Sequence, residues 1–277
     1  MRGASEQRVL TILRDLAARL ASRPEVAAVA LAGSRTTQVA DHDSDFDLYV
    51  YAESSIPLLV RTALADEFGR PGPREIGNDF WGSSDAWRVG TTGKDTDLDL
   101  MYFAPDWMAD QLDRVLVRHQ PSLGYSTCFW HTVRHSIALY DRDGWFARLQ
   151  TQAAAPYPEP LRRAIIAHNY PVLRGIASSL RHQLARAIER ADRVSIQHRL
   201  TAILASYFDI LFAVNRQPHP GEKRLVAHAL ARCPSLPAAF PADLDALLAE
   251  PPGPTTITRT DTLLDGLDNM LMREGLR

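Results

Sequence analysis

Residues 33–47 read Gly33-Ser34-Arg35-Thr36-Thr37-Gln38-Val39-Ala40-Asp41-His42-Asp43-Ser44-Asp45-Phe46-Asp47. The seven apolar residues before this stretch, Val26–Ala32, predict a short buried strand. A second predicted strand, residues 45–51, alternates apolar and polar side chains: Phe46, Leu48 and Val50 against Asp45, Asp47 and Tyr49. The carboxylates of Asp45 and Asp47 therefore leave one face of this strand, about 6–7 Å apart at the backbone.

Two carboxylates at this spacing can converge on one metal ion, or bridge two ions about 3.5–4 Å apart. Magnesium prefers a few carboxylates, several waters and the phosphates of its substrate. Gly33 and Ser34 end the first strand, where unpaired backbone N–H groups can face an anion and the serine hydroxyl adds a donor. Arg35 would add a positive charge to the same triphosphate. The stretch thus predicts Mg²⁺ at the two aspartates beside a phosphate cradle.

A third carboxylate is expected from a neighbouring strand. Residues 96–103 alternate again and place Asp97 and Asp99 on one face. We favour Asp99, which lies in mid-strand between Leu98 and Leu100, and Asp97 stays the alternative. The third aspartate would hold a second ion or accept the proton of the attacking hydroxyl. An acidic loop without a metal is the competing interpretation, but carboxylates within an apolar strand are hard to place without a cation.

The remaining sequence predicts two parts. Helices are expected at 6–21 and 57–68, with short strands and turns over 70–93. After Leu149 a proline-rich linker, 153–160, precedes a series of helical patterns: 161–184, 193–215, 223–232, 244–248 and 260–272, the last capped by Thr260 or Asp261. The predicted fold is an α/β (α+β) catalytic domain with a small mixed sheet, residues 1–150, followed by an α-helical bundle domain, residues 151–277.

Composition narrows the class of partner. The chain has 277 residues, of which 45% are hydrophobic and 23% charged, an ordinary globular balance. Two cysteines, Cys128 and Cys233, favour a reducing cytoplasm over a disulfide framework. No stretch approaches the roughly 20 apolar residues that span a bilayer. A net charge of -2 disfavours nucleic acid as a partner and favours small molecules or proteins.

An apolar strand, Gly33-Ser34, ten residues, Asp45-x-Asp47 and a later apolar-Asp-apolar strand together resemble the DNA polymerase β-type nucleotidyltransferase superfamily. The resemblance covers residues 26–102. With its appended helical part, the chain is similar to the antibiotic nucleotidyltransferases that act on aminoglycosides or lincosamides. The resemblance implies that Asp45 and Asp47 bind Mg²⁺ and that the third aspartate is a metal ligand or base. It also implies that Lys223, which follows a Pro/Gly turn, contacts the triphosphate.

The expected activity is Mg²⁺-dependent transfer of a nucleoside monophosphate, with AMP from ATP favoured over another NTP, to a hydroxyl of a small molecule. An aminoglycoside-like antibiotic is one candidate acceptor, and acidic residues such as Glu75, Asp79 and Asp85 would meet its positive charges. The acceptor is expected in a cleft between the two domains. Two alternatives stay open. One is an AMP-transferring enzyme of toxin–antitoxin type that modifies a protein, and the other is a nucleotide-binding module without catalysis.

Three further residues invite other interpretations. His131 and His135 have the i, i+4 spacing of zinc hydrolases, but Thr132 stands where those enzymes carry a glutamate. We therefore expect both histidines at the surface or in a substrate cleft. Asp209 lies in an apolar helical pattern, where an ion pair in helix packing is a commoner explanation than a catalytic base.

Overall fold

The computed structural model describes residues 4–36, 44–80, 82–91, 94–249 and 251–277. The chain forms two compact units: one comprises Met1–Leu112 and Thr132–Ala155, and the other comprises Asp113–His131 and Pro156–Arg277. The predicted domains, 1–150 and 151–277, stay a prediction, because compactness alone does not establish independent folding. Among the described residues, none of the helices combines the length and apolar character that crossing a bilayer requires.

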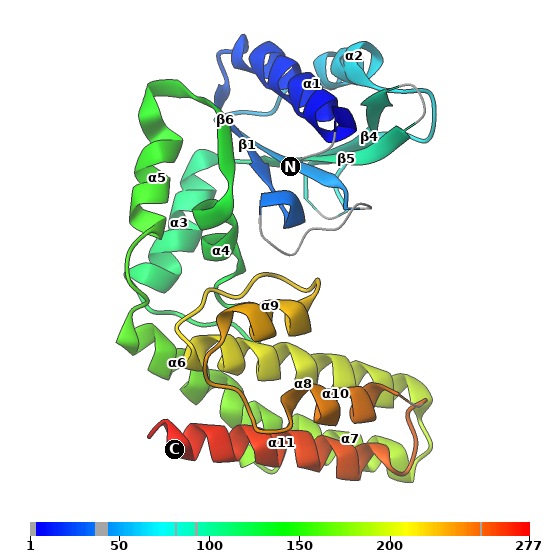
Figure 1. Cartoon of the computed structure of the whole chain (residues 1–277), viewed down its shortest axis with the longest axis vertical. Helices are drawn as coiled ribbons and strands as arrows, with labels where there is room; N and C mark the ends of the chain where they lie inside the picture. Colours follow the sequence, from blue (N-terminus) through cyan, green and yellow to red (C-terminus); the bar gives the residue numbers. More distant parts are fainter. Residues whose placement is uncertain (1–3, 37–43, 81, 92–93, 250) are drawn as a thin grey trace. The chain divides into compact units, whose positions relative to one another are not determined.

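The first unit contains a six-stranded mixed sheet in the order β3-β4-β5-β2-β1-β6 (Figure 1). Its strands are β1 (Val26–Ala32), β2 (Phe46–Ala52), β3 (Glu75–Asn78), β4 (Ser84–Thr91), β5 (Lys94–Phe103) and β6 (Ile137–Asp141). Strands β2 and β5 pair in parallel, and the other neighbours pair antiparallel. The predicted small mixed sheet is confirmed, as are the strands expected at 26–32, 45–51 and 96–103.

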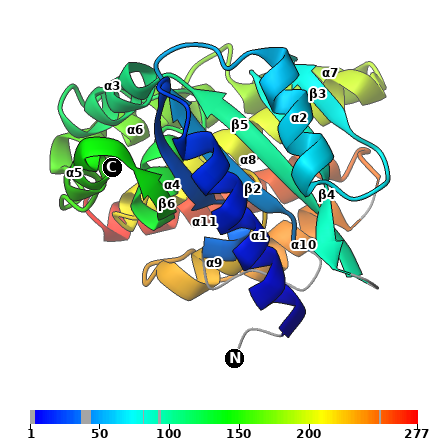
Figure 2. The same ribbon diagram turned by 90° about the horizontal axis from the view of Figure 1, so that it is seen from above.

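Two helices, α1 (Ala4–Ala21) and α2 (Leu58–Phe68), lie over one face of this sheet (Figures 1 and 2). The alternation of β2 turns one set of its side chains into the core with α1: Phe46, Leu48 and Val50 with Leu13, Leu16 and Leu20. Because successive side chains of a strand point to opposite faces, Asp47 and Tyr49 leave from the other face. The helical layer therefore determines which face of the sheet carries the carboxylates.

The sequence patterns did not predict β6 or the three helices that precede and follow it in the sequence. These helices are α3 (Pro105–Leu116), α4 (Cys128–His135) and α5 (Trp145–Ala153). Strand β6 pairs with β1 at the edge of the sheet, and its residues are exposed or half-buried along their whole length. A short edge strand without a buried face has no alternation of polarity, so period-two patterning cannot find it.

The described part of the second unit is helical. Its helices are α6 (Glu159–Tyr170), α7 (Leu180–Glu189), α8 (Arg193–Val214), α9 (Leu225–Arg232), α10 (Phe240–Leu248) and α11 (Thr256–Arg273). Helix α8 contacts α6, α7, α9 and α11, and its second half is buried nearly all round. A helix that is apolar on every side occupies the middle of a core. Whether the unit is a bundle domain of its own stays a prediction.

The predicted boundaries of two long helices are wrong. The helix expected over 161–184 is two helices, because α6 ends at Tyr170 and a π-helical turn, Pro171–Gly175, follows it. Proline lacks the N–H of the helical ladder and crowds the preceding turn, so the break falls there. Helix α11 begins at Thr256, and the hydroxyl of Thr260 donates to the Thr256 carbonyl inside it rather than capping the start.

Candidate metal centre

The structure brings three aspartates together on the first unit. Strands β2 and β5 run in register, so that Asp47 pairs with Asp99, and Asp45 immediately precedes β2. One carboxylate oxygen from each of Asp45, Asp47 and Asp99 lies within 4.8 Å of the other two. All three residues are half-buried. Within the described ranges, this is the group of acidic, histidine or cysteine side chains whose geometry suits a metal ion.

The neighbouring strands leave room around these carboxylates. Ala32 of β1 lies opposite Asp47, and Ala86 of β4 lies opposite Asp99. Directly opposed residues of a sheet project from the same face, so short side chains there do not cover the acids. The flanking residues Phe46 and Leu98 are buried on the other face. The sheet thus anchors the strands through the apolar side that faces α1 and α2, and it presents the half-buried acids on the opposite side.

Position 33 requires glycine because the Asp47 side chain occupies the space that a Cβ would need. Its φ is +72°, and a Cβ at this position would lie 1.8 Å from Oδ2 of Asp47. Any side chain would therefore strain the backbone and displace the carboxylate. Ser34 follows in a short 3₁₀ turn, Ser34–Thr36. The hydroxyl of Thr36 donates a hydrogen bond to the Gly33 carbonyl at 2.9 Å. The predicted phosphate contacts of Gly33 and Ser34 stay predictions, and residues 37–43 lie outside the described ranges.

Arg35 supports the entry into β2. Its guanidinium donates to the carbonyl oxygens of Ser44 and Asp45, the latter at 3.1 Å, and lies 4.0 Å from the ring centre of Phe46. These contacts connect the turn after β1 to the residues that carry the first two carboxylates. The predicted contact between Arg35 and a triphosphate stays a prediction, but the side chain has a positioning role independent of it.

The two candidates for the third carboxylate differ in their surroundings. Asp99 belongs to the three-aspartate cluster. Asp97 has 76% of its side chain exposed and lies 3.5 Å from the guanidinium of Arg88, its cross-strand partner on β4. The register of the sheet therefore separates two aspartates that the alternation alone had left equivalent.

The cluster fits a divalent cation by its chemistry. Carboxylate oxygens are the protein ligands that Mg²⁺ prefers, and partial exposure leaves space for the waters and phosphates that complete its octahedral shell. Like charges held this close repel one another, and a bound cation would relieve that repulsion. Gly33 also fits this interpretation, because the absence of a side chain there leaves the space that the Asp47 carboxylate occupies.

The prediction that Asp85 contacts a cationic acceptor is wrong. It is 1% exposed and accepts hydrogen bonds from Arg61 Nε at 2.8 Å and from the Tyr102 hydroxyl at 2.7 Å. Burial raises the pKa of Tyr102, which keeps that donor proton in place. Glu75 and Asp79 are exposed, and their predicted contact with an acceptor stays a prediction.

Sequence reasoning missed a row of aromatic side chains on the face that carries the aspartates. Tyr49 follows Asp47 by two residues and lies 5.0 Å from Phe103, whose ring stacks on Trp107 at 5.3 Å. Trp107 is 40% exposed. The continued alternation of β2 and β5 past their aspartates was the signal that pointed to Tyr49 and Phe103. Trp87 of β4, by contrast, is buried and cannot stack on a ligand, and Trp81 lies outside the described residues.

Lys223 belongs to the second unit. It is exposed in the turn before α9, which begins at Leu225 rather than at the lysine itself. Arg224 between them has a left-handed backbone conformation, with φ of 55°, so the helix cannot extend back through it. The predicted contact of Lys223 with a triphosphate stays a prediction.

Asp209 lies in the core of the second unit. It is 1% exposed and accepts hydrogen bonds from the backbone N–H and hydroxyl of Ser126, at 3.0 and 2.6 Å, and from the Asn169 amide at 3.2 Å. Burial raises its pKa to about 7, against the lowering effect of these donors. The expected ion pair in helix packing is thus replaced by hydrogen bonds that hold the segment before α4.

His131 is buried, with Nδ1 3.3 Å from the carbonyl oxygen of Pro218, so its expected place at the surface is wrong. His135 is half-buried. The metal-compatible group found among the described residues includes neither histidine. The absence of the catalytic glutamate from this helix agrees with a packing role for His131.

A family model described as a domain of unknown function, DUF4037, matches residues 129–225. No curated protein matches the chain significantly. A solved structure, a nucleotidyltransferase-like protein from Exiguobacterium sibiricum, is similar over 95% of this chain and 74% of its own, with 13% identity and a TM-score of 0.44. At this identity and score, the likeness says nothing about activity.

Proposed function

We propose that the chain is a Mg²⁺-dependent nucleotidyltransferase that transfers a nucleoside monophosphate, AMP from ATP in the favoured case, to a hydroxyl of a small molecule. The observation that carries the proposal is the cluster of Asp45, Asp47 and Asp99, whose ligand oxygens lie within 4.8 Å of one another on adjacent parallel strands. Three convergent, partly exposed carboxylates on one face of a sheet suit metal-assisted phosphoryl chemistry better than a structural role.

Each residue would have a defined task. Asp45 and Asp47 would hold Mg²⁺, and Asp99 would hold a second ion or accept the proton of the attacking hydroxyl. When bound, the metal would neutralise the triphosphate and favour in-line attack with pyrophosphate as the leaving group. Gly33 keeps the space for the Asp47 carboxylate, and its turn offers Ser34 to a phosphate. Lys223 would supply a further positive charge.

The aromatic row would contribute to binding of the substrates. Tyr49, Phe103 and Trp107 line the face that bears the carboxylates, and Trp107 is partly exposed. An exposed aromatic ring can stack on a nucleobase or on the ring of an acceptor. An aminoglycoside-like or lincosamide-like antibiotic is a candidate acceptor, on the ground of the sequence resemblance.

The two alternatives predict different outcomes. Transfer of AMP to a protein would use the same carboxylates, so only the acceptor distinguishes it from transfer to a small molecule. A module that binds nucleotide without catalysis predicts that a metal carboxylate is missing. All three aspartates are present in the cluster, which favours an enzyme.

The test is pyrophosphate release from each of the four NTPs with Mg²⁺, against a panel of aminoglycosides and lincosamides. The wild type is compared with Asp47→Asn, which removes the charge at nearly constant shape. Asp97→Asn is the matched control, because it makes the same change on an exposed aspartate outside the cluster. Circular dichroism checks that each variant is folded.

Release that depends on the acceptor, persists in Asp97→Asn and falls at least about 10³-fold in Asp47→Asn would support the proposal, since charge stabilisation at a reacting phosphate supplies effects of this size. Release that is equal in Asp47→Asn and the wild type would refute it. If Mg²⁺-ATP binds but no small molecule is modified, the same assay with protein acceptors decides between protein modification and a non-catalytic module.

A further inference from the structure

The turn between α8 and α9, residues 216–224, has a strained backbone. Arg216 and Arg224 at its two ends have φ of 52° and 55°, a left-handed conformation that is unfavourable for residues with a side chain. Helix α9 begins directly after it, at Leu225. Because a strained conformation persists only where its surroundings hold it, the contacts of this turn decide whether it stays closed.

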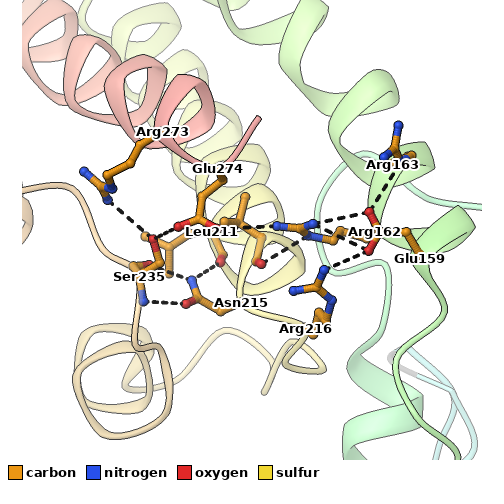
Figure 3. A network of polar contacts seen from close by, with 10 residues as sticks. Glu159, Arg162, Arg163, Leu211, Asn215, Arg216, Ser235, Arg273 and Glu274 are labelled. Atoms are coloured by element: carbon orange, nitrogen blue, oxygen red, sulfur yellow. Dashed lines mark hydrogen bonds and ion pairs between the residues drawn. The ribbon is translucent and has the colours of Figure 1, made fainter. Parts of the chain in front are cut away.

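The start of the turn is anchored by polar groups (Figure 3). The Asn215 amide donates to the Ser235 carbonyl at 2.7 Å and accepts from the Ser235 N–H at 2.8 Å. Nη2 of Arg216 lies 3.0 Å from a carboxylate oxygen of Glu159. Burial raises the pKa of Glu159, but Arg162 and Arg216 lower it by more, so this carboxylate stays ionised in weakly acidic solution. The start of the turn should therefore stay in place there.

The middle of the turn is held by His219, which is fully buried. Its backbone N–H donates to the Thr127 hydroxyl, in the segment before α4, at 2.8 Å. Its ring centre lies 5.0 Å from that of Tyr125 and 5.2 Å from that of Phe212 on α8. Nδ1 of the ring accepts a hydrogen bond from the Gly221 N–H at 3.1 Å. The imidazole thus joins the turn to two other segments of the second unit.

The hydrogen bond from Gly221 requires a neutral imidazole. Nδ1 accepts only when it carries no proton, so the proton of the ring is on Nε2. Protonation of His219 would direct a new N–H at the N–H of Gly221, and it would leave a charge in a fully buried place. The closed turn and a protonated His219 are therefore incompatible.

The histidines around His219 favour its neutral form. Burial, and next the charge of the buried His228 on α9, lower the pKa of His219 to about 3. The ring centre of His131 on α4 lies 5.8 Å from that of His228, and its Nδ1 donates to the Pro218 carbonyl at 3.3 Å. Three buried histidines thus pack against the turn, and a proton on one makes a proton on its neighbour less favourable.

The carboxylates of this region do not compensate a charge on His219. Asp209 on α8 accepts hydrogen bonds from the N–H and hydroxyl of Ser126. Glu222 is exposed on the turn, and with burial it raises the pKa of Tyr125, so that phenol is neutral. The lowered pKa of His219 results from burial and a neighbouring histidine, and neither carboxylate offsets it.

We propose that His219 is a pH-sensitive switch: its neutral imidazole keeps the turn 216–224 closed, and its protonation opens the turn between Thr127 and α9. The other cations of the turn, Lys223 and Arg224, add positive charge near it and favour opening further. Lys223 is the residue predicted to contact a triphosphate, so acid would also displace that charge. This consequence rests on the proposed function, whereas the switch itself does not.

The test is hydrogen–deuterium exchange of the full chain at pH 7.5 and pH 5.0. Exchange is read by mass spectrometry on peptides from residues 217–232 and is divided by the intrinsic rate at each pH, which gives the opening constant. His219→Asn is the informative variant, because its amide oxygen can accept from Gly221 as Nδ1 does but has no titration. His198→Asn is the matched control, since it makes the same change on an exposed histidine of α8. Circular dichroism verifies the fold.

In the wild type the opening constant should rise about 30-fold from pH 7.5 to pH 5.0, because opening restores the ordinary histidine pKa of 6.5 and each pH unit below it favours the open turn about tenfold. The same rise is expected in His198→Asn, and one at least about tenfold smaller in His219→Asn. Asp209 titrates in all three proteins and cancels from the comparison. A constant value in the wild type, or an equal rise in His219→Asn, would overturn the proposal.

Nitrogen-15 NMR of the wild type tests the same switch without a variant. At pH 5.0 exposed imidazoles are protonated, whereas the imidazole of His219 should be neutral with its proton on Nε2 in the closed molecules. A neutral signal of this tautomer among the nine histidines would support the proposal. Nine protonated imidazoles in the folded protein at pH 5.0 would refute it.

Discussion

Asp47 of β2 and Asp99 of β5 occupy directly paired positions of two parallel strands, so their carboxylates leave the sheet side by side. Asp97, two residues earlier on the same face of β5, pairs instead with Arg88 of β4. One face of one strand therefore carries an aspartate that belongs to the metal centre and another that belongs to a surface ion pair. This difference supplies matched controls for the experiments that follow.

Divalent metal binding should depend on Asp99 and not on Asp97. Mutation of groups that only orient a metal ligand costs about 10–100-fold in affinity, so Asp99→Asn should weaken binding at least that much. Asp97→Asn should bind as the wild type does. Electron paramagnetic resonance of Mn²⁺, titrated into each protein without nucleotide, measures the affinity. Equal weakening by both substitutions would assign the effect to general surface charge instead of to a site.

Gly33→Ala should disturb the metal centre through Asp47. The new Cβ would overlap Oδ2 of Asp47, so the carboxylate must move, and the alanine would be held at a positive φ that is unfavourable for it. A displacement of about 1 Å at a catalytic group can cost about 10²-fold in rate, and a comparable loss is expected in pyrophosphate release. Gly275→Ala is the control, since its φ is +65° and a Cβ there meets open space. If both variants retain wild-type Mn²⁺ affinity, Gly33 has no role in placing Asp47.

Asp85→Ala should destabilise the fold strongly. The substitution leaves the buried Arg61 guanidinium without its carboxylate partner, and breaking a buried ion pair costs about 3–5 kcal/mol. Asp97→Ala removes an exposed pair and should cost about 0–1 kcal/mol. Urea unfolding followed by circular dichroism gives both free energies. A cost for Asp85→Ala no larger than that for Asp97→Ala would contradict the assignment of Arg61 and Asp85 as a buried structural pair.

Asp209 should make stability depend on pH. Because burial raises its folded pKa to about 7 from 3.8, the folded state binds the proton more tightly than the unfolded state. Its contribution is therefore fully present below about pH 4 and is lost as pH rises to about 7, by at most about 1.4 kcal/mol per pH unit. Asp209→Asn lacks this titration. Urea unfolding at several pH values should show the stability of the wild type falling relative to the variant across this window, whereas a constant difference would exclude the shifted pKa.

Local patterning predicted the elements that have a buried and an exposed side. The apolar run of β1 and the alternations of β2 and β5 were sufficient, because each of these strands packs apolar side chains beneath a layer of helix. Strand β6 has no buried face and was missed. The break between α6 and α7 was also missed, although Pro171 and Gly175 marked it, because the apolar spacing continues through them.

The sequence by itself determined that Asp45 and Asp47 project from one face of a strand, since a period of two follows from the backbone of any strand. It also determined that Asp97 and Asp99 share a face of theirs. Only the tertiary structure decided that Asp99 joins the cluster, because the pairing of β2 with β5 aligns residues that are 52 positions apart in the chain. The same holds for Asp85 and Asp209, whose partners lie 24 and 83 residues away. Periodicity describes a residue's neighbours along the chain, whereas register and burial depend on contacts between distant segments.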